Sequence, residues 1–234
     1  MDYNTMLTRL RELVDNPTPR VPVVMCLDIS GSMQGKPIQE LNAGLRQYLD
    51  ELQQDALTRT SAETAVVTFG TQARCAADFA TVNQISLEPL EAKGLTYMGE
   101  GLTLALDLLE KRKSQYQSSG VEYYQPILLI MSDGCPNGDP RVLREATSRI
   151  QKLVAARRLT VLAVGMGENA DMERLGQLSG RRAVKLQGLQ FREFFAWLSQ
   201  SISAVAASAS EDDTSMDLAA LQALAAQPWP EEAL

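Results

Sequence analysis

Short apolar runs recur along this chain, and a loop that contains glycine follows each of them. Strands that are buried on both faces of a parallel sheet have this near-continuous apolar pattern. The runs are residues 21–27, 64–69, 127–131 and 159–164, and the glycines that follow them are Gly31, Gly70, Gly134 and Gly165. We therefore expect these runs to be parallel strands of one sheet.

Between the runs, apolar residues return at the spacing of a helix that packs one face on a core. Pro37 suits a first helical turn, and Asp139 followed by Pro140 indicates an N-cap and the first helical position. The two clearest sets of helical positions are Ile38, Leu41, Leu45, Tyr48, Leu49 and Leu52, and Val142, Leu143, Ala146, Ile150, Leu153 and Val154.

The segment after the second run departs from this alternation. Gly70-Thr71 lies between two strand-like runs, which indicates a hairpin into residues 73–79 and an antiparallel strand at the sheet edge. Farther along, the pattern predicts a weak strand at 183–186 and helices at about 98–117, 171–178 and 191–205. Together these elements predict an α/β fold of three layers. It is Rossmann-like, with a mostly parallel central sheet, one short antiparallel edge strand, helices on both faces and right-handed crossovers.

The domain boundaries follow from the two ends of the chain. We assign residues 20–206 to the α/β domain and residues 1–19 to an N-terminal helix and a proline-containing linker. Residues 207–234 are expected to form a flexible acidic linker and a short amphipathic tail. The tail either folds back onto its own domain or docks in a groove of a partner, and both alternatives are open.

The composition agrees with a single globular domain. The chain has 234 residues, of which 45% are apolar and 22% are charged, so it can bury one sizeable core. Its net charge of −7 argues against a nucleic-acid partner, because such proteins need a concentrated basic surface. No stretch reaches the roughly 18 to 20 apolar residues of a membrane span, and the N-terminus lacks the pattern of a signal peptide. We expect a cytoplasmic protein with no membrane partner.

Cysteine and histidine usage limits the chemistry. The three cysteines are widely spaced and predict neither a disulfide framework nor a paired-cysteine site. The chain has no histidine, which excludes Ser-His-Asp and Cys-His relays and histidine-ligated zinc. Cys26 lies in a buried run and is expected to pack in the core. Cys135 is either a plain loop residue or a residue with a redox or ligand role.

Two polar clusters have simple structural interpretations. The basic residues at 111–113 and 157–158 are expected near the carboxyl ends of helices, where positive charge complements the helix dipole. The Tyr123-Tyr124 pair is expected to pack at the entry to the strand that follows it.

Oxygen-bearing residues follow the first strand directly. In the stretch Asp28-Ile29-Ser30-Gly31-Ser32, a carboxylate and two hydroxyls alternate in a tight turn, and these are the hard oxygen groups that Mg²⁺ prefers. Such a turn can also be a plain Asx or Ser turn that caps the next helix. On its own, the motif does not decide between these alternatives.

Two further loops are expected at the same edge of the sheet. In folds of this class ligands bind at the carboxyl ends of the strands. Residues 132–134 end another predicted strand and carry Asp133, while residues 94–99 open the helix before that strand and carry Thr96. The convergence of the three loops favours a metal site over turn chemistry, although Asp133-Gly134 alone would fit a simple turn.

These motifs resemble the metal-ion-dependent adhesion site of von Willebrand factor type A (vWA) domains. Asp-x-Ser-x-Ser, a threonine in a glycine-flanked loop and Ser-Asp-Gly fill all five ligand positions of that pattern, within a stretch of roughly 21–205. Within that superfamily the chain is similar to the bacterial tellurium-resistance TerY-like proteins. The stretches that carry this similarity are residues 94–99, residues 110–113 followed by 123–126, and residues 191–195.

The resemblance implies a specific ligand set. Ser30, Ser32 and Thr96 would contact Mg²⁺ or Mn²⁺ through their hydroxyls, and Asp28 and Asp133 would act chiefly through water. A carboxylate from an Asp or Glu of a partner protein would complete the metal's shell. The domain would then be a non-enzymatic protein-binding module.

The resemblance also implies a cellular setting. TerY-like genes often lie beside a serine/threonine kinase and a metal-dependent protein phosphatase, so an adaptor or scaffold in bacterial stress or defence signalling is expected. Other bacterial members of the superfamily work with an AAA+ ATPase in metal insertion or complex remodelling, and that alternative is open.

An enzymatic alternative uses Asp28 as the nucleophile of a metal-dependent phosphatase. The Asp-x-Asp pattern of aspartyl-phosphate hydrolases is absent, because Ser30 occupies the second acidic position. The chain also has no Gly-x-x-x-x-Gly-Lys-Ser/Thr phosphate loop. We therefore expect a binding protein and not an enzyme.

Overall fold

The predicted strands and helices form in chain order as expected. The computed structural model describes residues 12–13, 15–133, 136–166, 170–180, 183–186 and 190–208, without the side chain of Gln190. The elements are β1 (Val21–Asp28), η1 (Gly31–Met33), α2 (Lys36–Gln54), α3 (Ala56–Ser61), β2 (Ala62–Phe69), β3 (Ala73–Thr81), η2 (Val82–Gln84), α4 (Met98–Ser119), β4 (Ile127–Ser132), α5 (Pro140–Ala155), β5 (Thr160–Met166), α6 (Met172–Ser179), β6 (Val184–Leu186) and α7 (Gln190–Ala207).

One six-stranded sheet runs through the molecule, in the order β3-β2-β1-β4-β5-β6. All neighbouring strands are parallel except β2 and β3, which are joined by the expected hairpin. β3 continues two residues past the predicted range, to Thr81, and its pairing with β2 contains register shifts. The predicted fold class, mostly parallel with one antiparallel edge strand, is confirmed.

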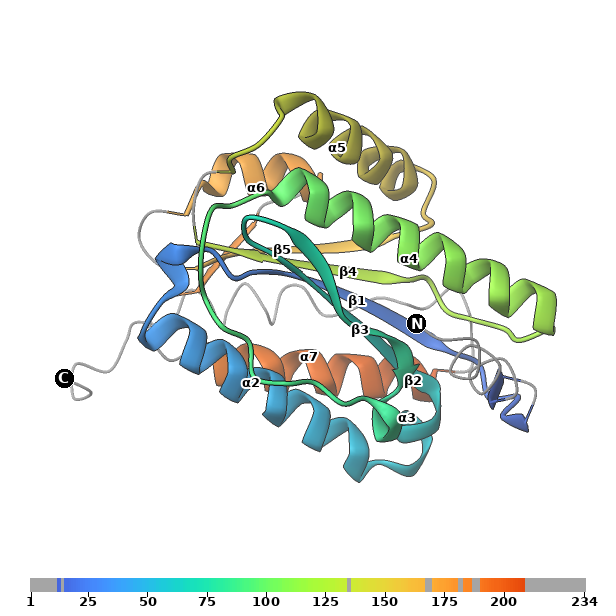
Figure 1. The fold of residues 1–234 in the computed structure, drawn as a ribbon. Coiled ribbons are helices and arrows are strands. Elements are labelled where there is room, and N and C mark those ends of the chain that lie inside the picture. The colour runs from blue at the N-terminus through green and yellow to red at the C-terminus, as the bar shows by residue number, and fades with distance from the viewer. Residues whose placement is uncertain are drawn as a thin grey trace.

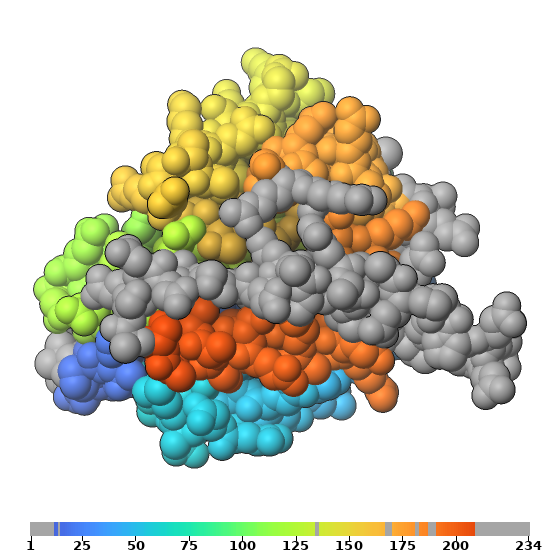
Figure 2. Space-filling view, turned by 180° about the vertical axis from the view of Figure 1, so that it is seen from behind, coloured from blue at the N-terminus to red at the C-terminus, as the bar shows by residue number. Residues whose placement is uncertain are grey.

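Helices cover both faces of the sheet and give three layers (Figure 1). Side chains of β1 alternate between the two faces, as the pleat of a strand requires. Val23 and Met25 pack in a cluster with α2 and α7, whereas Val24 and Cys26 pack in a cluster with α4 and α5. From behind, α7 lies against the segment that contains α2 and α3, and α5 and α6 lie on the opposite side (Figure 2). β1 is therefore buried on both faces, which explains its continuous apolar run.

The helix ends follow the expected capping chemistry. Asp139 accepts a hydrogen bond from the Arg141 N–H and caps α5, whose first residue is Pro140. Gly180 ends α6 in the left-handed region, with φ 62°. The short helix α3 was not predicted; Asp55 caps it by accepting from Thr58 N–H.

A buried ion cluster lies at the amino ends of β1 and β2. The Glu63 carboxylate accepts hydrogen bonds from Arg20 Nε at 2.9 Å, from Arg112 Nε and Nη2 at 2.7 Å each, and from Tyr116 Oη at 2.7 Å. Glu12 adds a second carboxylate, 3.4 Å from Arg20 Nη2 and 3.9 Å from Arg112 Nη2. The two arginines and the two glutamates balance in charge.

The cluster corrects the interpretation of Arg112 as a cation near a helix end. α4 continues to Ser119, and the Arg112 side chain is 3% exposed and bound to Glu63. The prediction that Tyr123 and Tyr124 pack at the entry to a strand is confirmed. The backbone of Tyr123 forms a parallel β-bridge with Arg20 beside β1, and Tyr124 is buried ahead of β4.

Several predictions fall on residues outside the described ranges. Of the N-terminal helix predicted before residue 15, only Glu12 and Leu13 are described, both as helical. The acidic linker and tail from residue 209 onward, and Cys135, also lie outside them. Within the described residues, no helix has the length and apolar character needed to cross a membrane.

Candidate metal centre

Three loops meet at the carboxyl edge of the sheet. The first loop (residues 28–34) follows β1, the second loop (residues 93–97) precedes α4, and the third loop (residues 132–137, described except at 134 and 135) follows β4. β1 and β4 are parallel neighbours, with Leu27 opposite Met131. Asp28 and Ser132 are therefore the next residues on two adjacent strands, so the sheet itself brings the first and third loops together.

Asp28 lies at the base of the site and is fully buried. Its Oδ1 accepts a hydrogen bond from the Ser30 N–H at 2.8 Å, and its Oδ2 accepts one from Ser132 Oγ at 2.6 Å. Burial raises the pKa of Asp28, the hydrogen bonds from Ser132 and Ser30 oppose that rise, and the charge of Asp133 adds to it. The two hydrogen bonds hold the carboxylate in one orientation.

A line of oxygen atoms runs from Ser30 to Asp133 above Asp28. Ser30 Oγ and Ser32 Oγ are 3.0 Å apart, and Ser32 Oγ donates to Asp133 Oδ1 at 2.9 Å. Ser30 is buried, Asp133 is half-buried and Ser32, between them in the line, is exposed, so the line reaches solvent at Ser32. Burial raises the pKa of Asp133 as well, and the hydrogen bond from Ser32 opposes this rise.

Thr96 is placed by the backbone of its loop. Gly31 N–H donates to the Gly94 carbonyl at 2.9 Å, which joins the first and second loops. The Thr96 N–H donates to Asn137 Oδ1 at 3.1 Å, and the Asn137 N–H donates to the Thr96 carbonyl at 2.8 Å. Thr96 is 6% exposed. These bonds fix the position of Thr96 relative to both neighbouring loops.

Because Gly94 has no side chain, the second loop can lie close to Thr71. Its φ is +83°, in the region that favours glycine, and a Cβ there would collide with Thr71 Oγ1. Thr71, from the β2–β3 hairpin, accepts a hydrogen bond from the Leu95 N–H at 3.1 Å. The hairpin thus supports the second loop from outside.

The five predicted residues are therefore brought to one end of the sheet, and the three loops form a closed ring of contacts. The first loop bonds to the second through Gly31, the second to the third through Thr96, and the third back to the first through Asp133 and Ser132. The predicted Asx turn also exists, as the Asp28–Ser30 contact. The turn is one part of the ring of loop contacts, and its presence is compatible with a metal site.

The donor set fits a magnesium-sized ion. Mg²⁺ takes octahedral oxygen ligands at about 2.0–2.1 Å, so neighbouring ligands lie about 2.9 Å apart. The Ser30–Ser32 and Ser32–Asp133 oxygen separations of 3.0 and 2.9 Å match such edges. None of the ion pairs formed by the described residues involves Asp28 or Asp133, so their charge is uncompensated within that part of the chain.

The site is not a closed cage of the kind built from charged ligands. No group of three or more His, Cys, Asp or Glu side chains among the described residues is placed to hold a metal. Neutral hydroxyls supply much of the donor set here. An ion bound by them keeps coordination positions for water or for an outside ligand.

Three supporting residues were not identified as functional from the sequence. Ser132 orients Asp28, Asn137 holds Thr96 and Thr71 supports the second loop. Ser132 directly precedes Asp133 in the sequence, and Asn137 follows it four positions later. A polar residue at the end of a buried strand is the signal that could have pointed to Ser132. Cys26 is buried in the core as expected.

Known proteins that resemble this chain include von Willebrand factor type A domains. The family model described as von Willebrand factor type A domain matches residues 23–194. Inter-alpha-trypsin inhibitor heavy chain H3 of Mesocricetus auratus is 24% identical over 157 residues, which are 65% of this chain and 17% of that protein. This chain therefore spans about a sixth of the length of that relative.

Solved structures share the fold at low sequence identity. A von Willebrand factor type A protein from Catenulispora acidiphila superposes with a TM-score of 0.55 at 20% identity, over 79% of this chain and 43% of that one. The vWF domain of the type V pili tip protein Mfa5 from Porphyromonas gingivalis gives 0.62 at 11%, over 82% and 98%. The pilus adhesin SpaC from Lactobacillus rhamnosus GG, in its open conformation, gives 0.63 at 13%, over 79% and 30%.

Proposed function

This chain belongs to the von Willebrand factor type A domain family, and from that membership and the loop geometry we propose that it is a metal-dependent protein-binding module. Domains of this family commonly serve in protein interaction or adhesion, they often bind a divalent metal, and they are typically not enzymes. The proposal assigns to this chain a complete metal-ion-dependent adhesion site made of Asp28, Ser30, Ser32, Thr96 and Asp133.

The observation that carries the proposal is the pair of uncompensated carboxylates beside a line of hydroxyl oxygens. Asp28 and Asp133 repel each other, and burial raises both pKa values. A divalent cation, Mg²⁺ or Mn²⁺, would offset both effects, with the hydroxyls of Ser30, Ser32 and Thr96 as ligands and the carboxylates acting chiefly through water. When bound, it supplies a Lewis-acidic face that attracts anionic oxygen.

Different residues of the chain position the proposed ligands and leave one side of the site open. Ser132 and the Ser30 N–H hold the Asp28 carboxylate in place, and Asn137 holds the backbone of Thr96. Ser32, in the middle of the oxygen line, is its exposed member and marks the side open to solvent. A carboxylate from an Asp or Glu of a partner protein is the ligand that fits this side, because it carries the charge that neutral hydroxyls lack.

The position of Asp28 argues against the phosphatase alternative. A nucleophilic carboxylate must reach the substrate phosphorus, yet Asp28 is fully buried and both of its oxygens accept hydrogen bonds from the chain itself. The buried, hydrogen-bonded Asp28 carboxylate is suited to orienting the water and hydroxyl ligands of a metal. We therefore propose a binding function without a catalytic step.

The partner class rests on the TerY-like motifs at residues 94–99, 110–113, 123–126 and 191–195. We propose a bacterial, cytoplasmic adaptor that brings together a serine/threonine kinase and a metal-dependent protein phosphatase in tellurite-type stress or defence signalling. Action beside an AAA+ ATPase is the alternative, and the genes that neighbour this one separate the two.

Affinity capture tests the proposal directly. Wild type and a Ser30→Ala/Ser32→Ala variant are used as bait, in Mg²⁺ and in EDTA, with Ser114→Ala/Ser118→Ala on the exposed part of α4 as the matched control. We expect partners that wild type and the control retain in Mg²⁺ and that the site variant and EDTA lose. Equal capture by all three proteins in Mg²⁺ and in EDTA would reject a metal-dependent function.

A further inference from the structure

A second polar site lies at the opposite end of the sheet from the metal loops. It is a cavity of about 650 Å³ between α4, the segment that enters β4 and the end of α5. Lys113 lines it from α4, Arg157 and Arg158 line it from the end of α5, and Tyr123 and Gln125 line it from the segment between. The cavity is therefore rich in positive charge.

Lys113 presents a cation to this cavity. The residue is 7% exposed, and it forms no hydrogen bond or ion pair with any other residue of the described chain. The stem of a lysine can be buried while its ammonium group reaches solvent, where an anion that enters the cavity can pair with it. The acidic residue that lines the cavity from the described part of the chain, Glu122, is exposed to solvent.

The backbone at Arg157 is a second sign of a binding role. Its φ is 54°, in the left-handed region, at the end of α5. At the C-caps of α4 and α6 the left-handed residues are glycines, Gly120 and Gly180, with φ of 66° and 62°, whereas Arg157 follows the C-cap of α5, Ala156. An arginine in this conformation carries strain that glycine would avoid, and such strain concentrates at functional positions. Arg157 lines the cavity, as does Arg158.

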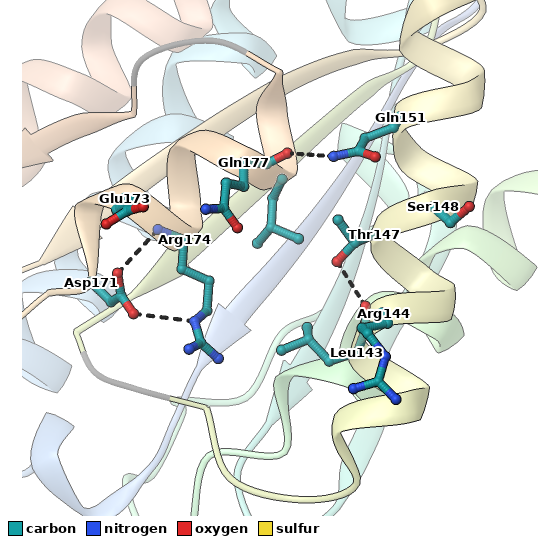
Figure 3. A pocket seen from close by; sticks show the side chains of 10 residues that line it. Leu143, Arg144, Thr147, Ser148, Gln151, Asp171, Glu173, Arg174 and Gln177 are labelled. Carbon is teal, nitrogen blue, oxygen red and sulfur yellow. Dashed lines mark hydrogen bonds and ion pairs between the residues drawn. The ribbon is translucent and has the colours of Figure 1, made fainter.

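The groove between α5 and α6 (Figure 3) differs from the Lys113 cavity in how its charged side chains are paired. Its volume is about 540 Å³, but the charges of Asp171 and Arg174 pair with each other at 3.1 Å. Gln151 donates to the Gln177 carbonyl at 3.1 Å. Asp171, Arg174 and Gln151 are thus engaged with other groups of the chain, whereas no such contact is found for Lys113 among the described residues.

The described chain ends beside the cavity, at Ser208. Tyr124 Oη donates to the Ser208 carbonyl at 2.8 Å, and Tyr124 lies between Tyr123 and Gln125, which both line the cavity. The sequence continues from Ser208 to Glu211, Asp212 and Asp213. Three to five residues can span up to about 10–18 Å, which is enough to reach the cavity from the tethered end of α7.

We propose that the acidic segment 211–213 of this same chain docks in the cavity and supplies carboxylates to Lys113, Arg157 and Arg158. The charges are complementary, and the segment is attached through a linker of only a few residues. Attachment of this kind gives an effective concentration in the millimolar range, so even weak ion pairs give substantial occupancy. The metal loops play no part in this contact.

Hydrogen–deuterium exchange of the full chain tests the docking. Three variants are compared with wild type at low salt: a tail variant (Glu211→Lys/Asp212→Lys/Asp213→Lys), a cavity variant (Arg157→Glu/Arg158→Glu), and the combination of both. Arg157 and Arg158 are exposed, so the cavity variant should fold, and its thermal midpoint verifies this. A fourth variant, Lys113→Met, keeps the apolar stem and removes the charge.

In wild type we expect amides 209–215 to exchange about tenfold more slowly than in an unstructured chain, and we expect high salt to abolish this protection. The tail, cavity and Lys113→Met variants should lose it, and the combined charge swap should regain it. Unprotected amides in wild type, or protection that survives the cavity variant, would overturn the proposal. The proposal would also be overturned if wild type and the tail variant bound an added phosphopeptide equally tightly. The tail would then not compete for the cavity, and the cavity would serve a ligand from another molecule.

Discussion

Ser132 Oγ donates a hydrogen bond to Asp28 Oδ2 at 2.6 Å and so joins the ends of two neighbouring parallel strands. Both side chains are fully buried, and the residues are 104 positions apart in the sequence. The hydrogen bond therefore couples the architecture of the sheet to the orientation of a carboxylate in the candidate metal centre.

Replacing Ser132 by Ala should destabilise the fold. It leaves one oxygen of a buried carboxylate without its donor, which costs about 1–3 kcal/mol. Urea unfolding measures the loss. Ser118→Ala, on the exposed part of α4, is the control and should change the free energy of unfolding by less than about 0.5 kcal/mol. Equal effects of the two substitutions would contradict this role for Ser132.

Divalent metal should stabilise wild type and not Asp28→Asn. At a hundredfold excess over the dissociation constant the gain is about 2.7 kcal/mol, or a rise of roughly 5–10 °C in thermal midpoint. Thermal unfolding in Mg²⁺, in Mn²⁺ and in EDTA checks this. Asp50→Asn, at an exposed position of α2, should respond like wild type. A metal-induced rise of the same size in Asp28→Asn would count against the assigned site.

Gly94→Ala should disturb the second loop. The added methyl group would meet the left-handed φ of +83° and the Thr71 hydroxyl, so we expect a loss of at least about 2 kcal/mol and weaker metal binding. Gly120→Ala is the matched control, because Gly120 has a φ of +66° but open space around it. It should cost about 1 kcal/mol and leave the metal response intact. Denaturant unfolding and metal titration of both variants decide the point.

Glu63→Gln should be among the most damaging substitutions in this chain. It leaves Arg20 and Arg112 buried without their main counter-charge, and breaking a buried pair in this way costs about 3–5 kcal/mol. Asp107→Asn breaks the exposed pair with Arg149 and should cost at most about 1 kcal/mol. Urea unfolding of both variants tests the difference, and similar losses would refute it.

The same cluster predicts a pH dependence through Glu12. Burial, followed by the charge of Glu63, raises the pKa of Glu12, and Arg20 and Arg112 only partly oppose the rise. A carboxyl whose pKa is higher in the folded state adds stability below its ordinary pKa of 4.5, and this is lost as the pH rises through the folded value. Relative to Glu12→Gln, the free energy of unfolding of wild type should fall from about pH 4 upward. A difference that grows with pH would show the opposite sign.

The strands were predictable because their signal is local. A strand buried on both faces must be apolar at nearly every position, and β1, β4 and β5 follow that rule. The helix α3 was missed because its six residues, from Ala56 to Ser61, are too few to show a period, and the Asp55 cap and packing define it instead.

The candidate site was predictable only in outline. The strand-end rule predicts that three oxygen-bearing loops share one edge, because it depends on topology alone. It does not predict that Ser132 supports Asp28 or that Asn137 holds Thr96, since each contact depends on the exact path of a loop. The Arg112–Glu63 pair was missed for a similar reason, as the residues are 49 positions apart and only tertiary packing brings them together.

The ring of contacts among the three loops also has a consequence for the timing of synthesis. It needs Gly31, Gly94 and Asn137, so a growing chain that ends before the third loop carries the first two motifs but not the assembled site. Under the proposed function, an unfinished or truncated product should hold no ion and recruit no partner. The ring would then restrict recruitment to chains whose central strands have already been made and paired.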